Sequence, residues 1–334
     1  MNKTVAFSKH SANVFFHILT HCNLRCRHCY INPREHGENT LPLDTIKEWL
    51  RLFASQTKTP NLILLGGEPT LHPDLSSAVK AARDMGYASV TIDTNGYLFH
   101  NILEKISPED VDFISFSLDG ATPAVNDAIR GKGCYQHCTA GIRNAVDRGF
   151  HTSLIYTVSN ENIHELAMMP ELLGRLGVDR FFIQVIGLRG NSATPEKHGL
   201  QVDRAAWRTL IPAVAEQVAD SGITVTYPKV FLDRGEAFAC AGNVADNYFI
   251  FPNGRVYRCP LCEDYPLHSL EIRENALVPT PKINERDLFG LQIPEGCVMN
   301  KLVQSGNLSY DKNGVPEYQI ACCLLKEEVP GRKG

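Results

Sequence analysis

The chain has 334 residues, of which 43% are hydrophobic and 21% charged, and its formal net charge is −4. A chain of this length can bury a full hydrophobic core. It has no basic block suited to nucleic acid or an anionic membrane, and no apolar run near the ~20 residues of a membrane span. The N-terminal segment lacks the apolar core of a secretory signal. We therefore expect a cytoplasmic protein with no nucleic-acid or membrane partner.

Short apolar runs alternate with helix-like stretches from about residue 13 to residue 187. The expected strands are residues 14–19, 62–65, 89–92, 113–117, 153–158 and 181–186. The expected helices are residues 43–55, 74–85, 98–106, 137–148, 163–176 and 204–219. Six strand–helix units of similar length predict an α/β fold with a parallel sheet, open or curled into a partial (β/α)6 TIM-like barrel.

The sequence changes character after about residue 227, where turn residues multiply and helical periodicity fades. Residues 247–259 predict a hairpin with Pro252, Asn253 and Gly254 in its turn. We expect two domains, a barrel core over residues 10–225 and a small cysteine-rich domain over residues 235–334.

Eleven cysteines are distributed unevenly: three within residues 22–29, two at Cys134 and Cys138, and six from Cys240 onward. In a reducing cytosol, clustered cysteines are more often metal ligands or redox groups than disulfides. The distribution predicts two separate metal sites. Cys134 and Cys138, four residues apart without nearby partners, are expected to be unligated.

Cys22, Cys26 and Cys29 follow the first expected strand in one short loop. Such a loop can surround one iron–sulfur cluster, with each sulfur on a different iron. Three protein ligands leave one iron of a four-iron cluster open. The alternative is a zinc site in which His21 or His28 supplies the fourth ligand.

This loop resembles the Cys-x3-Cys-x2-Cys signature of the radical S-adenosylmethionine (SAM) superfamily, including the aromatic Tyr30 that follows it. The resemblance implies a 4Fe–4S cluster whose open iron chelates the amine and carboxylate of SAM. It also implies reductive cleavage of SAM to a 5′-deoxyadenosyl radical, which abstracts hydrogen from a substrate.

Gly66, Gly67 and Glu68 follow the second expected strand. Two glycines allow close approach of backbone to a ligand, although a tight strand–helix turn explains them equally well in isolation. After the cysteine loop, they resemble the GGE motif of the same family. The resemblance implies that their backbone meets the amino group of SAM.

Two further strand ends carry segments similar to those that surround SAM in the family. On this resemblance, Ser117 and Asn95 are expected to contact SAM. The contact of Ser117 is expected to be with the ribose or the carboxylate of SAM. Arg130 lies in a segment that resembles one whose arginine pairs with the SAM carboxylate. A solvated charge at a helix end is the alternative for Arg130.

The second cysteine field begins with Cys240 and Cys259, separated by thirteen residues, Gly254 and four more residues. This spacing resembles the opening of the SPASM auxiliary-cluster motif or its shortened form, Twitch. The remaining candidate ligands are Cys262, Cys297, Cys322 and Cys323. One auxiliary 4Fe–4S cluster is expected, held by Cys240, Cys259, Cys262 and one of the last three cysteines. A zinc knuckle is the alternative.

The sequence thus predicts a radical SAM oxidoreductase or maturase acting on a peptide or protein, or on a small molecule such as a tetrapyrrole. A reductant such as flavodoxin or ferredoxin is the expected partner. Because the first strand begins near Asn13, no N-terminal peptide-recognition domain is expected. No general acid or base is assigned. The competing hypothesis is a non-catalytic iron–sulfur or zinc-binding electron-transfer protein.

Overall fold

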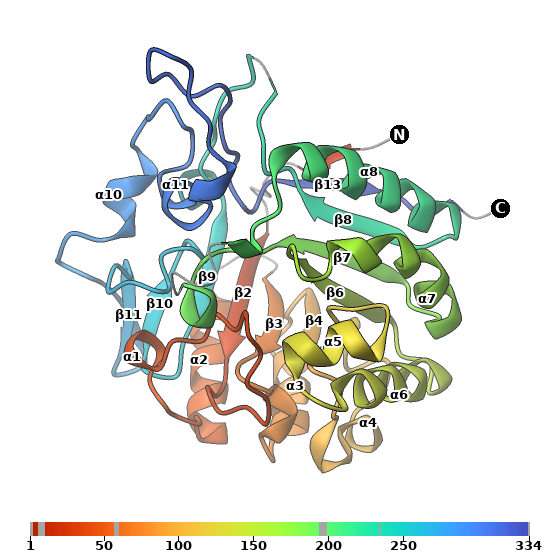
Figure 1. The fold of residues 1–334 in the computed structure, drawn as a ribbon. Coiled ribbons are helices and arrows are strands. Elements are labelled where there is room, and N and C mark those ends of the chain that lie inside the picture. The colour runs from red at the N-terminus through yellow and green to blue at the C-terminus, as the bar shows by residue number, and fades with distance from the viewer. Residues whose placement is uncertain (1–2, 6–10, 57–59, 194–198, 234, 333–334) are drawn as a thin grey trace.

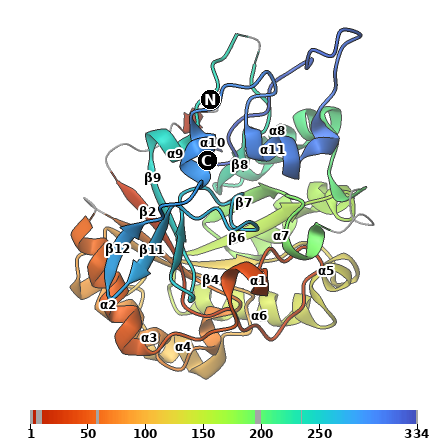
Figure 2. The same ribbon diagram turned by 90° about the vertical axis from the view of Figure 1, so that its left-hand side faces the viewer.

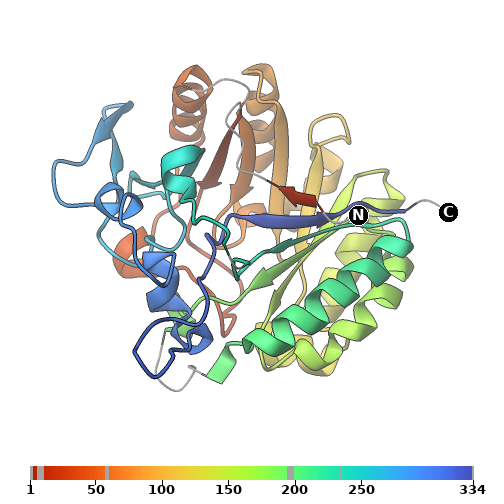
Figure 3. The same ribbon diagram turned by 90° about the horizontal axis from the view of Figure 1, so that it is seen from above.

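The computed structural model describes residues 3–5, 11–56, 60–193, 199–233 and 235–332. Within them, one thirteen-stranded sheet has the order β1-β13-β8-β7-β6-β5-β4-β3-β2-β9-β10-β11-β12. Neighbours from β2 to β8 are parallel, and β9 is parallel to β2. The sheet is curved, and the larger helices cover its outer face (Figure 1; Figure 3).

The predicted α/β fold and its strand–helix alternation are confirmed. The core strands are β2 Ala12–His17, β3 Asn61–Leu65, β4 Ser89–Thr94, β5 Phe113–Ser117, β6 Thr152–Val158, β7 Arg180–Val185 and β8 Thr224–Pro228. The helices that follow them are α2 Leu43–Gln56, α3 Leu75–Asp84, α4 Ile102–Lys105, α5 Pro123–Arg130, α6 Cys134–Asp147, α7 Met169–Leu176 and α8 Arg204–Asp220.

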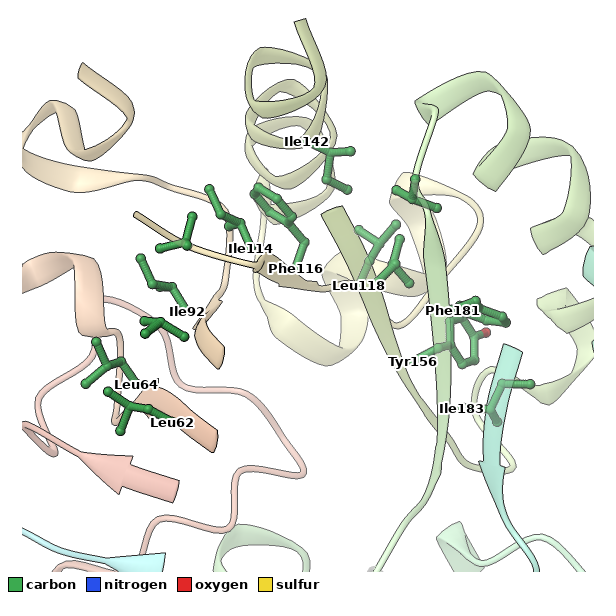
Figure 4. Packing of buried hydrophobic residues seen from close by; sticks show 14 of the residues in the cluster. Leu62, Leu64, Ile92, Ile114, Phe116, Leu118, Ile142, Tyr156, Phe181 and Ile183 are labelled. Atoms are coloured by element: carbon green, nitrogen blue, oxygen red, sulfur yellow. The ribbon is translucent and has the colours of Figure 1, made fainter. Parts of the chain in front are cut away.

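Alternation along the strands separates a buried outer face from a partly exposed inner face. In β4, Val90 and Ile92 are buried, whereas Thr91 and Asp93 between them are only half-buried. Figure 4 shows the outer face, where Phe116 of β5 approaches α6. Because successive strand residues point to opposite faces, the polar Asp93 belongs to the inner surface of the curved sheet.

Three local predictions differ from the structure. The stretch at 98–106 is broken, because Leu98, His100 and Asn101 have positive φ, and only Ile102–Lys105 is α-helical. Helix α5 was not predicted, although Thr122 caps it by accepting a hydrogen bond from Val125 N. Strand β8, rich in β-branched residues, was also missed.

The C-terminal third extends both edges of the same sheet (Figure 1; Figure 2). Beyond β2 lie β9 Asp246–Ile250, β10 Arg255–Tyr257, β11 Leu270–Arg273 and β12 Ala276–Pro279, and beyond β8 lie β13 Lys326–Val329 and β1 Lys3–Val5. The short helices are α1 Pro33–His36, α9 Ala241–Val244, α10 Glu285–Phe289 and α11 Val298–Val303. The predicted hairpin is confirmed, with Gly254 at φ +86° between β9 and β10. The division into two domains stays a prediction.

No helix in the described parts of the chain is both long and apolar enough to span a membrane.

Candidate active site

The cysteine loop of residues 22–29 lies just beyond the carboxyl end of β2. Its backbone is fixed to α5, since Arg27 N donates to Ile129 O at 2.9 Å. Cys26 Sγ donates to Arg130 O at 3.9 Å, and Cys22 Sγ accepts from Leu24 N at 3.4 Å. All cysteines of the chain have free thiols. The three thiols are therefore held in one loop at the edge where parallel-sheet ligand sites form.

The three thiols influence one another. Burial, together with nearby Glu68, Cys26 and Cys29, raises the pKa of Cys22 to about 12. Burial likewise raises the pKa of Cys26 to about 11. Three adjacent half-buried thiolates repel one another, and iron ions supply the positive charge that stabilises them.

No group of three or more His, Cys, Asp or Glu side chains is placed to hold one metal ion among the residues described. In an iron–sulfur cluster each thiolate binds a different iron, so its thiols do not converge on one point. His28, an alternative zinc ligand in the sequence, places Nε2 at 2.8 Å from Asp119 Oδ2. The donor set of three thiols on one loop fits a cluster.

Gly66 and Gly67 allow the turn after β3 to touch the cysteine loop. A Cβ on Gly66 would lie 2.3 Å from Leu19 O, and one on Gly67 would lie 2.1 Å from His21 O. Gly67 N donates to Leu19 O at 3.0 Å. Because these collisions are with backbone, side chains at the two positions would displace the loop.

Glu68 connects this turn to the end of β4. Its carboxylate accepts hydrogen bonds from Thr70 N and Oγ1, Thr94 Oγ1 at 2.8 Å and Asn95 N at 2.7 Å. The side chain is fully buried, and burial raises its pKa. With its oxygens bonded inside the protein, Glu68 shapes the turn, and any contact with SAM here falls to the backbone.

The structure brings Asn95 to the cysteine loop. Asn95 Nδ2 donates to Asn23 Oδ1 at 2.8 Å and lies 3.9 Å from Cys22 Sγ. Ser117 ends β5 and is half-buried, with its carbonyl accepting from Cys138 Sγ at 3.5 Å. Both residues thus lie at strand ends, with Asn95 beside the cysteine loop, and their roles as SAM contacts stay predictions.

Asp119, two residues beyond β5, contacts the side chains of Arg130 and His28. Its Oδ2 lies 2.6 Å from Arg130 Nε and 2.8 Å from His28 Nε2, and Oδ1 accepts from Thr157 N. Burial raises the pKa of Asp119, but Arg130 and His28 outweigh it and hold the pKa at about 2. The carboxylate is therefore ionised, and Arg130 is buried beside the loop rather than solvated at a helix end.

Tyr30 extends the loop toward the C-terminal third. Its hydroxyl forms a 2.7 Å hydrogen bond with His17 Nε2, and Arg189 Cζ lies 4.7 Å from its ring centroid. His17 in turn stacks on Phe251 with ring centroids 4.0 Å apart. Burial raises the pKa of Tyr30 well above its usual range. Tyr30 therefore packs between the first cysteine loop and the segment that carries the second cysteine field.

Most of the C-terminal cysteines line one cavity, which we call the second cavity because it belongs to the second cysteine field. Its cysteine lining consists of Cys240, Cys259, Cys297, Cys322 and Cys323. Cys262 is buried beside Cys259, and their thiols form a hydrogen bond. Glu285 fixes the loop by accepting from Cys259 N at 3.0 Å. More thiols surround this cavity than one 4Fe–4S cluster needs, and the ligand set stays a prediction.

Cys134 and Cys138 occupy the first turns of α6 and are buried. Cys134 Sγ donates to Arg130 O at 3.5 Å, the carbonyl that Cys26 Sγ also faces. Cys134 is thus separated from the cysteine loop by the carbonyl of Arg130.

Sequence reasoning missed several residues that organise the site. The sequence predicts no role for Asp119, and it indicates His28 only as an alternative zinc ligand. Asn191 donates from N to Cys29 O at 2.8 Å and from Nδ2 to Cys26 O at 3.1 Å. Nothing in the sequence indicates Asn191, because it lies far along the chain in an irregular segment.

The comparisons with known proteins agree with this geometry. Residues 17–173 match the model of the Radical SAM superfamily. The chain is 31% identical over 214 residues to pre-heme d1 synthase of Dinoroseobacter shibae, covering 63% of this chain and 52% of that protein. It is 30% identical over 198 residues to Fe-coproporphyrin III synthase of Methanosarcina barkeri, covering 58% of this chain and 49% of that protein. The chain thus spans about half the length of these curated relatives.

Two solved structures share the fold. Streptococcus suis SuiB bound to precursor peptide SuiA has a TM-score of 0.64 at 16% identity, covering 76% of this chain and 60% of SuiB. Native anSMEcpe with bound AdoMet has a TM-score of 0.62 at 13% identity, covering 88% of each chain. The family match begins at the cysteine loop and spans the strands whose ends surround it. Residues 17–173, which contain the cysteine loop, belong to the radical SAM superfamily.

Proposed function

We propose that the chain is a radical SAM oxidoreductase or maturase. The observation that carries the proposal is the loop of Cys22, Cys26 and Cys29, held by backbone contacts at the carboxyl edge of a parallel sheet beside the Gly66–Gly67 turn. When bound there, a reduced 4Fe–4S cluster supplies one electron that cleaves SAM to methionine and a 5′-deoxyadenosyl radical. The three cysteines would hold the cluster.

The surrounding residues have distinct tasks in this proposal. The backbone of Gly66, Gly67 and Glu68 would face the amino group of SAM, and Arg130 would face its carboxylate with its guanidinium oriented by Asp119. Asn95 and Ser117 complete the predicted contacts at neighbouring strand ends. The substrate would lose its hydrogen atom beside the half-buried inner face of the sheet, because the carboxyl ends of the strands lie at the edge of that face.

We propose an auxiliary 4Fe–4S cluster of the SPASM or Twitch type in the second cavity. Its support is the set of thiols lining that cavity together with the Cys240–Cys259 hairpin. Burial raises the pKa values of Cys240 and Cys297, and the nearby Cys259 and Cys322 contribute to both increases, which indicates that these thiols lie close together. These four are the ligand set that we favour from the geometry.

For the substrate, we propose a tetrapyrrole-like small molecule ahead of a peptide. Two relatives at 30–31% identity are named for pre-heme d1 and Fe-coproporphyrin III synthesis, and others at 31% identity are named as probable GTP 3′,8-cyclases, so these names all refer to small molecules. The peptide-bound neighbours share only 12–16% identity. An electron donor of the flavodoxin or ferredoxin class would reduce the cluster.

The test is 5′-deoxyadenosine formation by the anaerobically reconstituted full chain with SAM and dithionite. Cys26→Ala is expected to abolish the product, whereas Cys134→Ala, the matched control whose thiol faces the same Arg130 carbonyl, retains it. No 5′-deoxyadenosine from the unaltered chain, with unchanged iron content in Cys26→Ala, overturns the proposal. Stimulation by coproporphyrin rather than by peptide fractions of native extract would support the substrate class.

A further inference from the structure

The turn of residues 189–192, which follows β7, lies between the two cysteine fields. On one side, Asn191 donates to the carbonyls of Cys29 and Cys26. On the other side, Arg189 Nη1 donates to Pro260 O and to Glu263 Oε2 at 2.9 Å. One short turn therefore contacts both candidate cluster loops directly.

Gly190 keeps this turn close to the first loop. Its φ is +54°, and a Cβ there would lie 2.5 Å from Cys29 O and 2.7 Å from Tyr30 Cα. Its own N–H donates to Asp264 Oδ2 at 3.2 Å, on the second loop. The close approach on one side and the hydrogen bond on the other fix the separation of the two loops.

Arg189 places a positive charge at the centre of this arrangement. Its guanidinium lies over the ring of Tyr30, next to Cys29, while the same group pairs with Glu263, next to Cys262. The Arg189 side chain is 21% exposed and that of Glu263 is 3% exposed. Water therefore screens this charge only weakly from either site.

We propose that Arg189 is a positioning residue shared by the two iron–sulfur sites, which fixes their separation and raises the reduction potential of both. The inference rests on the proposed function, because it requires both clusters. Reduction adds negative charge to a cluster, so a nearby fixed cation favours the reduced form. Loss of Arg189 removes that stabilisation at two sites at once.

The test is a redox titration of the reconstituted full chain followed by electron paramagnetic resonance. Signals of the first site are assigned by their absence in Cys26→Ala. Arg189→Gln removes the charge but retains a donor for Pro260 O, and it is expected to lower the midpoint potentials of both sites. Arg189→Met must shift them in the same direction, and Arg189→Lys is expected to remain near the unaltered chain.

Arg258→Gln is the matched control. Arg258 lines the second cavity and donates from Nη2 to Ala245 O, and among the described residues it forms no hydrogen bond or ion pair with the cysteine loop. It is expected to change the second potential alone. Unchanged first-site potential in Arg189→Gln, or an equal shift of that potential in Arg258→Gln, overturns the inference. Failure of the proposed function instead appears as absence of 5′-deoxyadenosine, which is measured separately.

Discussion

Arg130 and Asp119 form a buried ion pair, with Nε 2.6 Å from Oδ2 and both side chains at most 10% exposed. The same carboxylate oxygen contacts His28 between two cysteines of the loop. Asp119 therefore joins the cluster loop, the end of α5 and, through Thr157 N, the carboxyl end of β6. The pair orients a guanidinium toward the loop at the cost of burying two charges.

We predict that Asp119→Ala lowers the free energy of unfolding by about 3–5 kcal/mol, because it leaves Arg130 buried without its partner. Because the pKa of Asp119 is held at about 2, the stability that its carboxylate adds to the folded protein is complete above the ordinary pKa of an aspartate. That stability declines as the pH falls toward 2. Urea unfolding of the cluster-free protein between pH 3 and pH 7 measures this. An equal free energy of unfolding for Asp119→Ala and the unaltered chain at pH 7 would contradict the prediction.

The glycine turn gives a second prediction. Gly67→Ala places a Cβ against the carbonyl of His21 and should displace the cysteine loop, so that iron content falls to that of the second site alone. Gly174→Ala is the matched control, because no atom lies within 4 Å of its added Cβ in α7. Iron and sulfide analysis after reconstitution decides the matter. Full iron content in Gly67→Ala would show that the loop tolerates the change.

Asp93 gives a prediction about pH. It lies on the inner face of β4, where burial raises its pKa to about 7 although Ser115 donates a hydrogen bond to it. A raised folded-state pKa makes stability decline as the pH rises from about 4 to about 7. Asp93→Asn removes this decline, so the variant should equal the unaltered chain near pH 4 and exceed its stability by on the order of 4 kcal/mol at pH 8, at about 1.4 kcal/mol per pKa unit. Urea unfolding of both proteins at pH 4 and at pH 8 tests this prediction. The same difference in unfolding free energy at both pH values would refute the raised pKa of Asp93.

The C-terminal cysteines give a fourth prediction. Cys297 lines the second cavity and Cys262 does not, so Cys297→Ala should lose the auxiliary cluster, whereas Cys262→Ala should retain it. Mössbauer spectra of iron-57 reconstituted variants count the clusters in each. Retention in Cys297→Ala with loss in Cys262→Ala would return the ligand set to the one that the sequence favours.

The sequence was informative where chemistry follows from local pattern. Alternating apolar runs predicted β2 to β7, and the helix expected over residues 204–219 is α8, which Asp203 caps by accepting from Ala206 N at 2.8 Å. Contacts between distant segments could not be predicted in this way. The approach of Asn191 to Cys29 and the sharing of Arg189 depend on how β7 is placed in the sheet, which no local spacing encodes.

The cysteine ligands illustrate the same limit. Spacing identified Cys240 and Cys259 as a pair, because the hairpin between them is local. It favoured Cys262 by proximity in sequence, whereas the cavity is completed by Cys297 and Cys322 from segments folded back over the hairpin. Adjacent Cys322 and Cys323 both line this cavity, contrary to the simple expectation that neighbouring side chains diverge.

The most direct measurement is electron–nuclear double resonance on the reduced, reconstituted protein with SAM labelled with nitrogen-15 at its amino group. If three thiolates leave one iron open, the amino nitrogen binds that iron and a hyperfine coupling to nitrogen-15 appears in the signal that Cys26→Ala removes. The absence of any coupling, with a cluster spectrum unchanged by SAM, would contradict the account.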